Sequence, residues 1–210
     1  MQVIKFSHAC VRIESDAVLV IDPGKFSERR ALDGVDAVLI THEHVDHLDV
    51  DALADELGKR PSVRVYTHSA VAAQLDALGG AVTSVNSGES FDAAGFRVRA
   101  FGGLHAEIHP DVPRVPNLGF LVEESLYHPG DSFDLPADAQ VDTLFVPISG
   151  PWLKISESVD FVRSVAPRRA FALHDSLLSE AGLGVYDANM ARLSGCAYAR
   201  LSAGESVSLP

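Results

Sequence analysis

Short hydrophobic runs rich in Val, Ile, Leu and Phe alternate along the chain with turn residues such as Gly, Pro, Asp and Ser. Runs of this length and composition are typical of β-strands. The run at 36–41 is apolar along most of its length, which predicts a strand covered on both faces. The pattern predicts strands at 2–6, 10–14, 17–22, 36–41, 63–67, 81–85, 89–93, 96–101, 118–124, 125–131, 142–148, 168–175 and 206–209.

Segments with apolar residues at helical spacing separate several of these strands. After 36–41, Val50, Leu53 and Leu57 lie on one helical face, and Asp49 precedes them as a candidate N-cap. The same reasoning predicts helices at 49–59, 69–80 (with Ser69 as cap), 156–166 and 186–195. Two successive rounds of strands and helices indicate a layered α/β fold with helices on the outer faces of packed sheets.

Length and composition narrow the class of protein. The 210 residues suit one domain, 1–210, and a hydrophobic content of 47% is enough for a substantial core. The net charge of -12 repels phosphate backbones, so nucleic acid is an unfavourable partner. No run reaches the ~20 apolar residues of a membrane span, and the first residues do not resemble a signal peptide. With Cys10 and Cys196 expected as reduced thiols, these features predict a cytoplasmic protein.

The strand at 36–41 is followed directly by the sequence THEHVDH, which contains His42, His44, Asp46 and His47. Buried without partners, such polar groups would cost about 1–3 kcal/mol each, and a divalent cation that accepts their lone pairs removes this cost. The i,i+2 spacing of the first two histidines does not fit a helical zinc motif, which needs i,i+4. Four donors in so short a segment are well placed to bind two adjacent ions.

This segment resembles the HxHxDH signature of the metallo-β-lactamase superfamily. The resemblance implies a four-layer αββα sandwich with two mixed sheets, and further metal ligands at the ends of later strands. His105, Asp131 and His174 stand at the matching positions, and the early segment VLVIDPG places Asp22 where an aspartate supports the ligand loop. The match extends from residue 1 to about residue 180. The opening and the segment from 144 are most similar to small metal-dependent hydrolases that include ascorbate-phosphate lactonase-like proteins.

The resemblance also implies the role of each residue. It implies one ion held by His42, His44 and His105, a second held by Asp46, His47 and His174, and Asp131 as the bridge between them. The expected cofactors are therefore two divalent ions, with zinc favoured over manganese or iron. A bridging hydroxide is expected to cleave a small ester, lactone or phosphoester, with Asp46 orienting this nucleophile. Asp22 and His8 are expected beside the ligands.

Residues that could contact a small-molecule substrate are less clearly marked. The proline-rich segment after His105 carries His109 and Arg114, and the segment before the helix at 156–166 carries Trp152 and Lys154. Surface exposure or loop packing explains these four residues equally well. The sequence leaves open whether the protein forms a homo-oligomer.

Two other functions share the signature. One is a phosphodiesterase or nuclease, which the net charge of -12 and the absence of a long basic insertion disfavour. The other is a di-iron redox protein, from which the sequence departs because flavodiiron relatives place a carboxylate where His44 stands. A non-enzymatic scaffold does not explain the intact ligand set.

Overall fold

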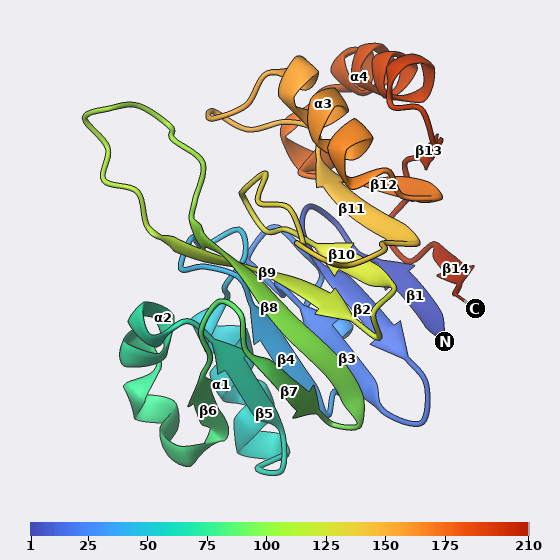
Figure 1. Cartoon of the computed structure of the whole chain (residues 1–210). Coiled ribbons are helices and arrows are strands. Elements are labelled where there is room, and N and C mark those ends of the chain that lie inside the picture. Colours follow the sequence, from blue (N-terminus) through green and yellow to red (C-terminus); the bar gives the residue numbers. More distant parts are fainter. Residues whose placement is uncertain (210) are drawn as a thin grey trace.

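The computed structural model describes residues 1–209 and contains two sheets of seven strands each (Figure 1). In the first sheet β1, β2, β3 and β14 pair antiparallel, and β3 to β6 pair parallel. Its strands, in spatial order, are β14 (Ser206–Ser208), β1 (Gln2–Lys5), β2 (Val11–Glu14), β3 (Val18–Ile21), β4 (Ala37–Ile40), β5 (Arg64–Thr67) and β6 (Val82–Ser84).

The second sheet repeats this mixture. Strands β7 to β10 pair antiparallel, and β10 to β13 pair parallel. Its strands, in spatial order, are β13 (Ala197–Ala199), β12 (Arg169–Leu173), β11 (Thr143–Pro147), β10 (Leu126–His128), β9 (Pro116–Val122), β8 (Phe96–Leu104) and β7 (Ser90–Ala93).

Helices cover the outer face of each sheet. In Figure 1 the helices α1 and α2 lie against the first sheet, and α3 and α4 lie against the second. The helical segments are η1 (Arg29–Leu32), α1 (Val50–Lys59), α2 (Ser69–Gln74), η2 (Asp76–Ala81), α3 (Ile155–Val165), η3 (Asp175–Leu177) and α4 (Glu180–Leu193), where η denotes a 3₁₀-helix. The predicted four-layer αββα sandwich is therefore confirmed.

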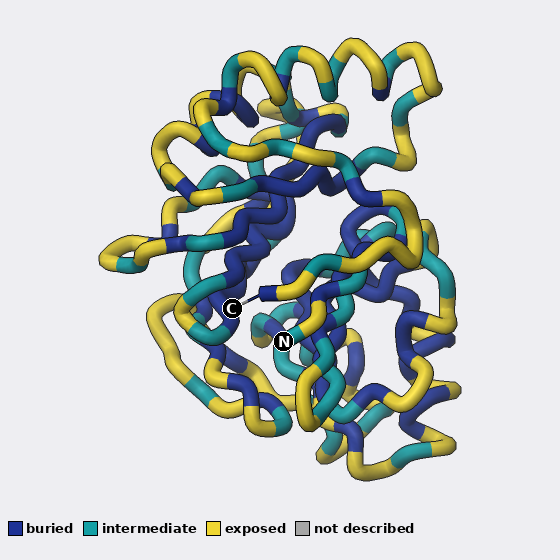
Figure 2. The backbone as a smooth tube through the Cα atoms, turned by 90° about the vertical axis from the view of Figure 1, so that its right-hand side faces the viewer, coloured by how far each residue is buried: buried dark blue, intermediate teal, exposed yellow. Residues whose placement is uncertain are grey.

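The core lies between the two sheets. In β2 the side chains of Val11 and Ile13 are buried, whereas those of Arg12 and Glu14 are partly exposed, as expected for a strand with one face in the core. Figure 2 shows the buried backbone running through the strands, with exposed residues on the outer helices and loops. As predicted, all four residues of β4 are buried, because its other face is covered by α1.

Three element predictions need correction. The cap of α2 is His68 rather than Ser69, because the His68 ring accepts a hydrogen bond from the N–H of Ala70. Helix α4 begins at Glu180, before the predicted start at 186, because Ser179 caps it and two glycines in its first turns had obscured the helical pattern. Strand β13 escaped prediction because it is short and pairs only at the sheet edge with β12.

The topology brings distant segments to one edge of the sandwich. The parallel strands β4, β10 and β12 end there, and the β8–β9 loop begins there. The segments that follow these strands carry the polar residues singled out in the sequence. None of the helices within residues 1–209 is long and apolar enough to cross a membrane.

Candidate metal centre

Two groups of His and Asp side chains meet at this edge. In each group the potential ligand atoms lie within 4.8 Å of one another. The first group consists of His42, His44, His105 and Asp131, and the second of His8, Asp46, His47 and His174. The seven residues expected as ligands are therefore brought together from four separate parts of the chain, and His8 joins them.

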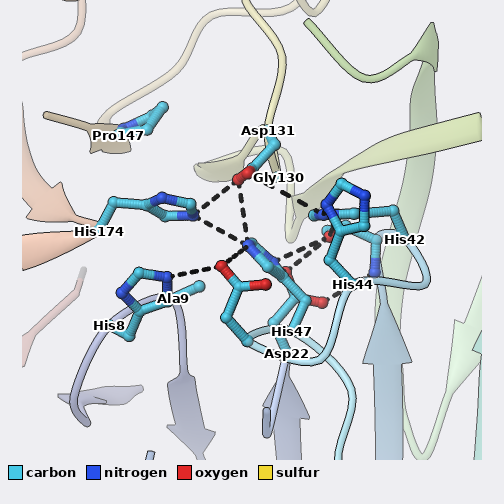
Figure 3. A network of polar contacts seen from close by, with 12 residues as sticks. His8, Ala9, Asp22, His42, His44, His47, Gly130, Asp131, Pro147 and His174 are labelled. Atoms are coloured by element: carbon cyan, nitrogen blue, oxygen red, sulfur yellow. Dashed lines mark hydrogen bonds and ion pairs between the residues drawn. The ribbon is translucent and has the colours of Figure 1, made fainter. Parts of the chain in front are cut away.

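Asp131 lies between the two groups, as Figure 3 shows. Its Oδ2 is 3.2 Å from Nε2 of His105 in the first group. Its Oδ1 is 2.7 Å from Nε2 of His174 and 3.1 Å from Nε2 of His47 in the second. Each oxygen faces a different group, which is the arrangement required of a carboxylate that bridges two ions.

Asp22 orients one imidazole of each group. It is fully buried, and its Oδ2 lies 2.6 Å from Nδ1 of His47. The same oxygen accepts the hydroxyl hydrogen bond of Thr41 at 2.7 Å, and this hydroxyl is 3.0 Å from Nδ1 of His42. Because the Thr41 proton is directed to Asp22, the Thr41 oxygen is free to accept from His42. Both imidazoles thus carry Nδ1–H and direct Nε2 toward the centre.

The position of Asp131 is fixed by Trp152 and by Asn117, a residue that the sequence did not single out. The buried side chain of Asn117 accepts the backbone N–H of Asp131 at 3.0 Å and donates to the carbonyl of Pro129 at 2.9 Å. The indole N–H of Trp152 donates to Asp131 Oδ2 at 3.1 Å. These contacts depend on tertiary packing, so no local sequence pattern announces them.

The electrostatics of the second group favour a bound cation. Burial disfavours the charged form of His47, but the carboxylates of Asp131 and Asp22 outweigh it and hold the His47 pKa well above 6.5. Burial also acts to raise the pKa of Asp131, yet His174 and His47 hold it well below 3.8. These carboxylates therefore keep His47 protonated, and a divalent cation bound at the same position can replace this proton.

The first group has the opposite tendency. Burial lowers the pKa of His42 well below 6.5, and burial together with the nearby His105 lowers that of His44. Both rings are thus neutral around pH 7 and offer lone pairs. The ring of His105 is oriented by its own segment, since Nδ1 lies 2.6 Å from the carbonyl of Ala106.

One buried atom tests directly whether these residues fit a metal. Asp131 Oδ1 has no hydrogen-bond partner within residues 1–209, although two imidazole nitrogens lie within 3.1 Å of it. A buried carboxylate oxygen without a hydrogen bond is costly, so close contacts of this kind are best explained by lone pairs that converge on a shared cation. The donor set fits two divalent ions.

The four expected substrate contacts lie in different environments. Trp152 is 8% exposed, and its indole N–H donates to Asp131, so the side chain is part of the centre. Arg114 donates Nε to the carbonyl of His105 at 2.6 Å, which ties the guanidinium to its own loop. Lys154 is exposed and caps α3 through its backbone. His109 is exposed on the β8–β9 loop, 3.6 Å from Asp111.

Comparisons with known sequences place the chain among related proteins. Protein Rv0786c of Mycobacterium tuberculosis is 40% identical over 193 residues, which is 89% of each protein. A UPF0173 protein of Pyrococcus furiosus is 31% identical over 192 residues, or 86% of each. UPF0173 metal-dependent hydrolase MJ1163 of Methanocaldococcus jannaschii is 23% identical over 180 residues, covering 80% of this chain and 82% of the relative. The second and third names support a UPF0173 branch, and none of the three refers to an ascorbate-phosphate lactonase.

Solved structures show the same fold. Igni18, described as a novel metallo hydrolase from Ignicoccus hospitalis, has a TM-score of 0.74 and 18% identity over 98% of this chain and 97% of that protein. CmlA, a diiron beta-hydroxylase from Streptomyces venezuelae, has a TM-score of 0.75 and 18% identity over 99% of this chain but 54% of CmlA. At this identity the likeness concerns the fold alone. A sequence model of the beta-lactamase superfamily domain matches residues 2–174, and the chain therefore belongs to this family.

Proposed function

We propose that the chain is a metal-dependent hydrolase that cleaves a small ester or lactone at a dinuclear metal site. The observation that carries this proposal is the Asp131 carboxylate, whose two oxygens face separate groups of donors. The name of the Methanocaldococcus jannaschii relative, a metal-dependent hydrolase, supports it. The first group offers three imidazoles and one carboxylate, a donor set that suits zinc.

When bound, two divalent cations lower the pKa of a shared water and polarise the oxygen of the substrate. Asp46 is the side chain suited to orient that water. Burial acts to raise the pKa of Asp46, but the hydrogen bond with His8 and the charge of His47 keep it well below 3.8. Its side chain is 19% exposed, so an ionised carboxylate borders the space open to solvent. An ionised carboxylate in this position can accept a hydrogen bond from that water and so orient it.

Exposed apolar side chains beside the two groups favour a substrate with an apolar part. Phe26 is 46% exposed, and its ring lies 5.2 Å from that of His8. Val45, between two residues of the centre, is 56% exposed, and Leu177, which follows His174 in η3, is 48% exposed. The guanidinium of Arg114 is committed to a backbone carbonyl, which weakens the case for an anionic group there. An ester or lactone therefore fits better than a phosphoester.

The alternatives receive less support. A nuclease requires a cationic surface for the phosphate backbone, and the chain has a net charge of -12. The diiron beta-hydroxylase CmlA shares the fold, so this scaffold accommodates other chemistry. The family resemblance implies a carboxylate in flavodiiron proteins at the position where this chain has His44, a member of the first group.

An activity screen tests the proposal. The full chain, loaded separately with Zn²⁺, Mn²⁺ or Fe²⁺, is assayed against lactones, carboxylic esters, thioesters, phosphodiesters and β-lactams, with Asp131→Ala as the inactive control. We expect metal-dependent hydrolysis of a lactone or ester that is lost in the folded variant. Hydrolysis of phosphodiesters alone, or full activity in Asp131→Ala, would contradict the proposal.

A further inference from the structure

The turn between β1 and β2 carries a histidine into the second group. His8 is fully buried, and its φ of 63° lies in the left-handed region, which is uncommon for residues other than glycine. The turn is anchored to the second sheet. The N–H of His174 donates to the carbonyl of His8 at 3.2 Å, and Nε2 of His128 lies 2.8 Å from the carbonyl of Ala9. Strained backbone held in this way is found at functional sites.

The imidazole of His8 lies where a ligand would lie. Its Nε2 is 3.0 Å from Oδ2 of Asp46, and its ring centroid is 4.1 Å from that of His174. One of its nitrogens lies within 4.8 Å of the ligand atoms of Asp46, His47 and His174. Its Nδ1 is buried and has no hydrogen-bond partner within residues 1–209. Within residues 1–209 the ring shares a hydrogen bond with Asp46 alone, so it is directed at the centre.

We propose that His8 binds the cation of the second group through Nε2, as an additional ligand beside Asp46, His47, His174 and Asp131, and that the cation then replaces the hydrogen bond between Nε2 and Asp46. This inference rests on the dinuclear site proposed above. With Asp131 counted for both ions, the second group then offers three imidazoles and two carboxylates, whereas the first group offers three imidazoles and one carboxylate.

The difference in donor number predicts a difference in metal preference. Four protein donors satisfy tetrahedral zinc, whereas manganese and iron accept five or six ligands. The second group therefore suits a metal of higher coordination number than the first group does. Without His8, the four remaining donors of the second group still satisfy zinc, so the loss of His8 weakens Mn²⁺ binding more than Zn²⁺ binding.

The alternative role for His8 is a hydrogen bond that only positions Asp46, and two variants separate the roles. In His8→Asn the asparagine tolerates the left-handed backbone, and the imidazole is lost. In His8→Gln the longer amide can still donate a hydrogen bond to Asp46 but supplies no ring nitrogen. The matched control is His68→Asn, which replaces a histidine outside both groups and keeps a residue able to cap α2.

The test combines diffraction from Mn²⁺-loaded crystals with titration of the full chain by Mn²⁺ and by Zn²⁺. We expect Nε2 of His8 about 2.0–2.2 Å from an ion. Both His8 variants should weaken one of the two Mn²⁺ binding steps by about 10- to 100-fold and the Zn²⁺ steps less, with His68→Asn unchanged. Two bound ions with His8 more than about 3 Å from either, or wild-type Mn²⁺ affinity in His8→Gln, would overturn the inference about His8 and leave the dinuclear site standing. A wild-type chain that binds no ion would overturn the proposed function as well.

Discussion

The substitution Asp22→Asn tests whether one buried carboxylate organises both halves of the centre. Asp22 lies 2.6 Å from Nδ1 of His47 and reaches His42 through the Thr41 hydroxyl. Asparagine keeps the shape and the backbone preference of the site, and its oxygen can still accept the backbone N–H of Thr41 that Asp22 now accepts at 2.8 Å. The charge is lost, and an amide N–H replaces an acceptor.

Two magnitudes follow from this geometry. Hydrogen bonds to a charged group contribute about 1.5–3 kcal/mol each, so losing those from His47 and Thr41 lowers the free energy of unfolding by about 3–6 kcal/mol before relaxation. Loss of a group that orients a ligand typically weakens metal binding by about 10- to 100-fold, or about 1.4–2.8 kcal/mol. Because Asp22 acts on an imidazole in each group, both binding steps should weaken.

The assay is a titration of folded Asp22→Asn with Zn²⁺ in competition with a chromophoric chelator, beside chemical denaturation. The matched control is Asp36→Asn, since Asp36 also accepts a backbone N–H, that of Val18 at 2.9 Å, and belongs to neither group. The control should lose some stability and no metal affinity. Wild-type affinity at both steps in folded Asp22→Asn would refute the role assigned to this carboxylate.

Three further predictions concern other parts of the centre. Gly24→Ala should reduce metal content, because a Cβ there would lie 1.9 Å from the carbonyl oxygen of Asp46, and elemental analysis at wild-type levels would contradict this. Asp175→Asn leaves the buried ammonium of Lys5 without its carboxylate and should lower the free energy of unfolding by about 3–5 kcal/mol. Adding Lys5→Met should recover most of that loss in denaturant titrations, and a double variant no more stable than the single one would count against it. On acidification, protons should displace the ion of the second group first, because the pKa of His47 is raised while those of two imidazoles in the first group are lowered. Metal content after dialysis at stepped pH should therefore fall in two steps, and simultaneous loss of both ions would argue against this order.

The layered α/β fold and the donor-rich segment at 42–47 could be predicted from the sequence because both leave local patterns, whereas the four-layer arrangement followed from the family resemblance. The alternation of Val11 to Glu14 and the apolar run of β4 specify which faces are buried. The residues of the THEHVDH segment are adjacent in sequence, so their proximity in space needs no tertiary information. The positions of His105 and His174 followed from the family resemblance, since each stands where a later strand of that fold ends.

The remaining features depend on contacts between distant segments. Trp152 was a candidate for substrate contact, and only the structure reveals that its indole N–H donates to the buried carboxylate of Asp131. Arg114 was also a candidate for substrate contact, and the structure reveals that its Nε–H donates to the carbonyl of His105. His8 was expected beside the ligands, and only its contacts with Asp46 and His174 in the structure reveal that its ring enters the second group.

The number of divalent cations per chain tests the central claim most directly. Protein stripped with a chelator, loaded with Zn²⁺ or Mn²⁺ and freed of weakly bound ions is measured by elemental analysis against protein concentration. Two groups of donors joined by Asp131 predict close to two ions per wild-type chain, and fewer in Asp131→Ala. A wild-type chain that retains one ion or none after loading with either metal would contradict the dinuclear centre.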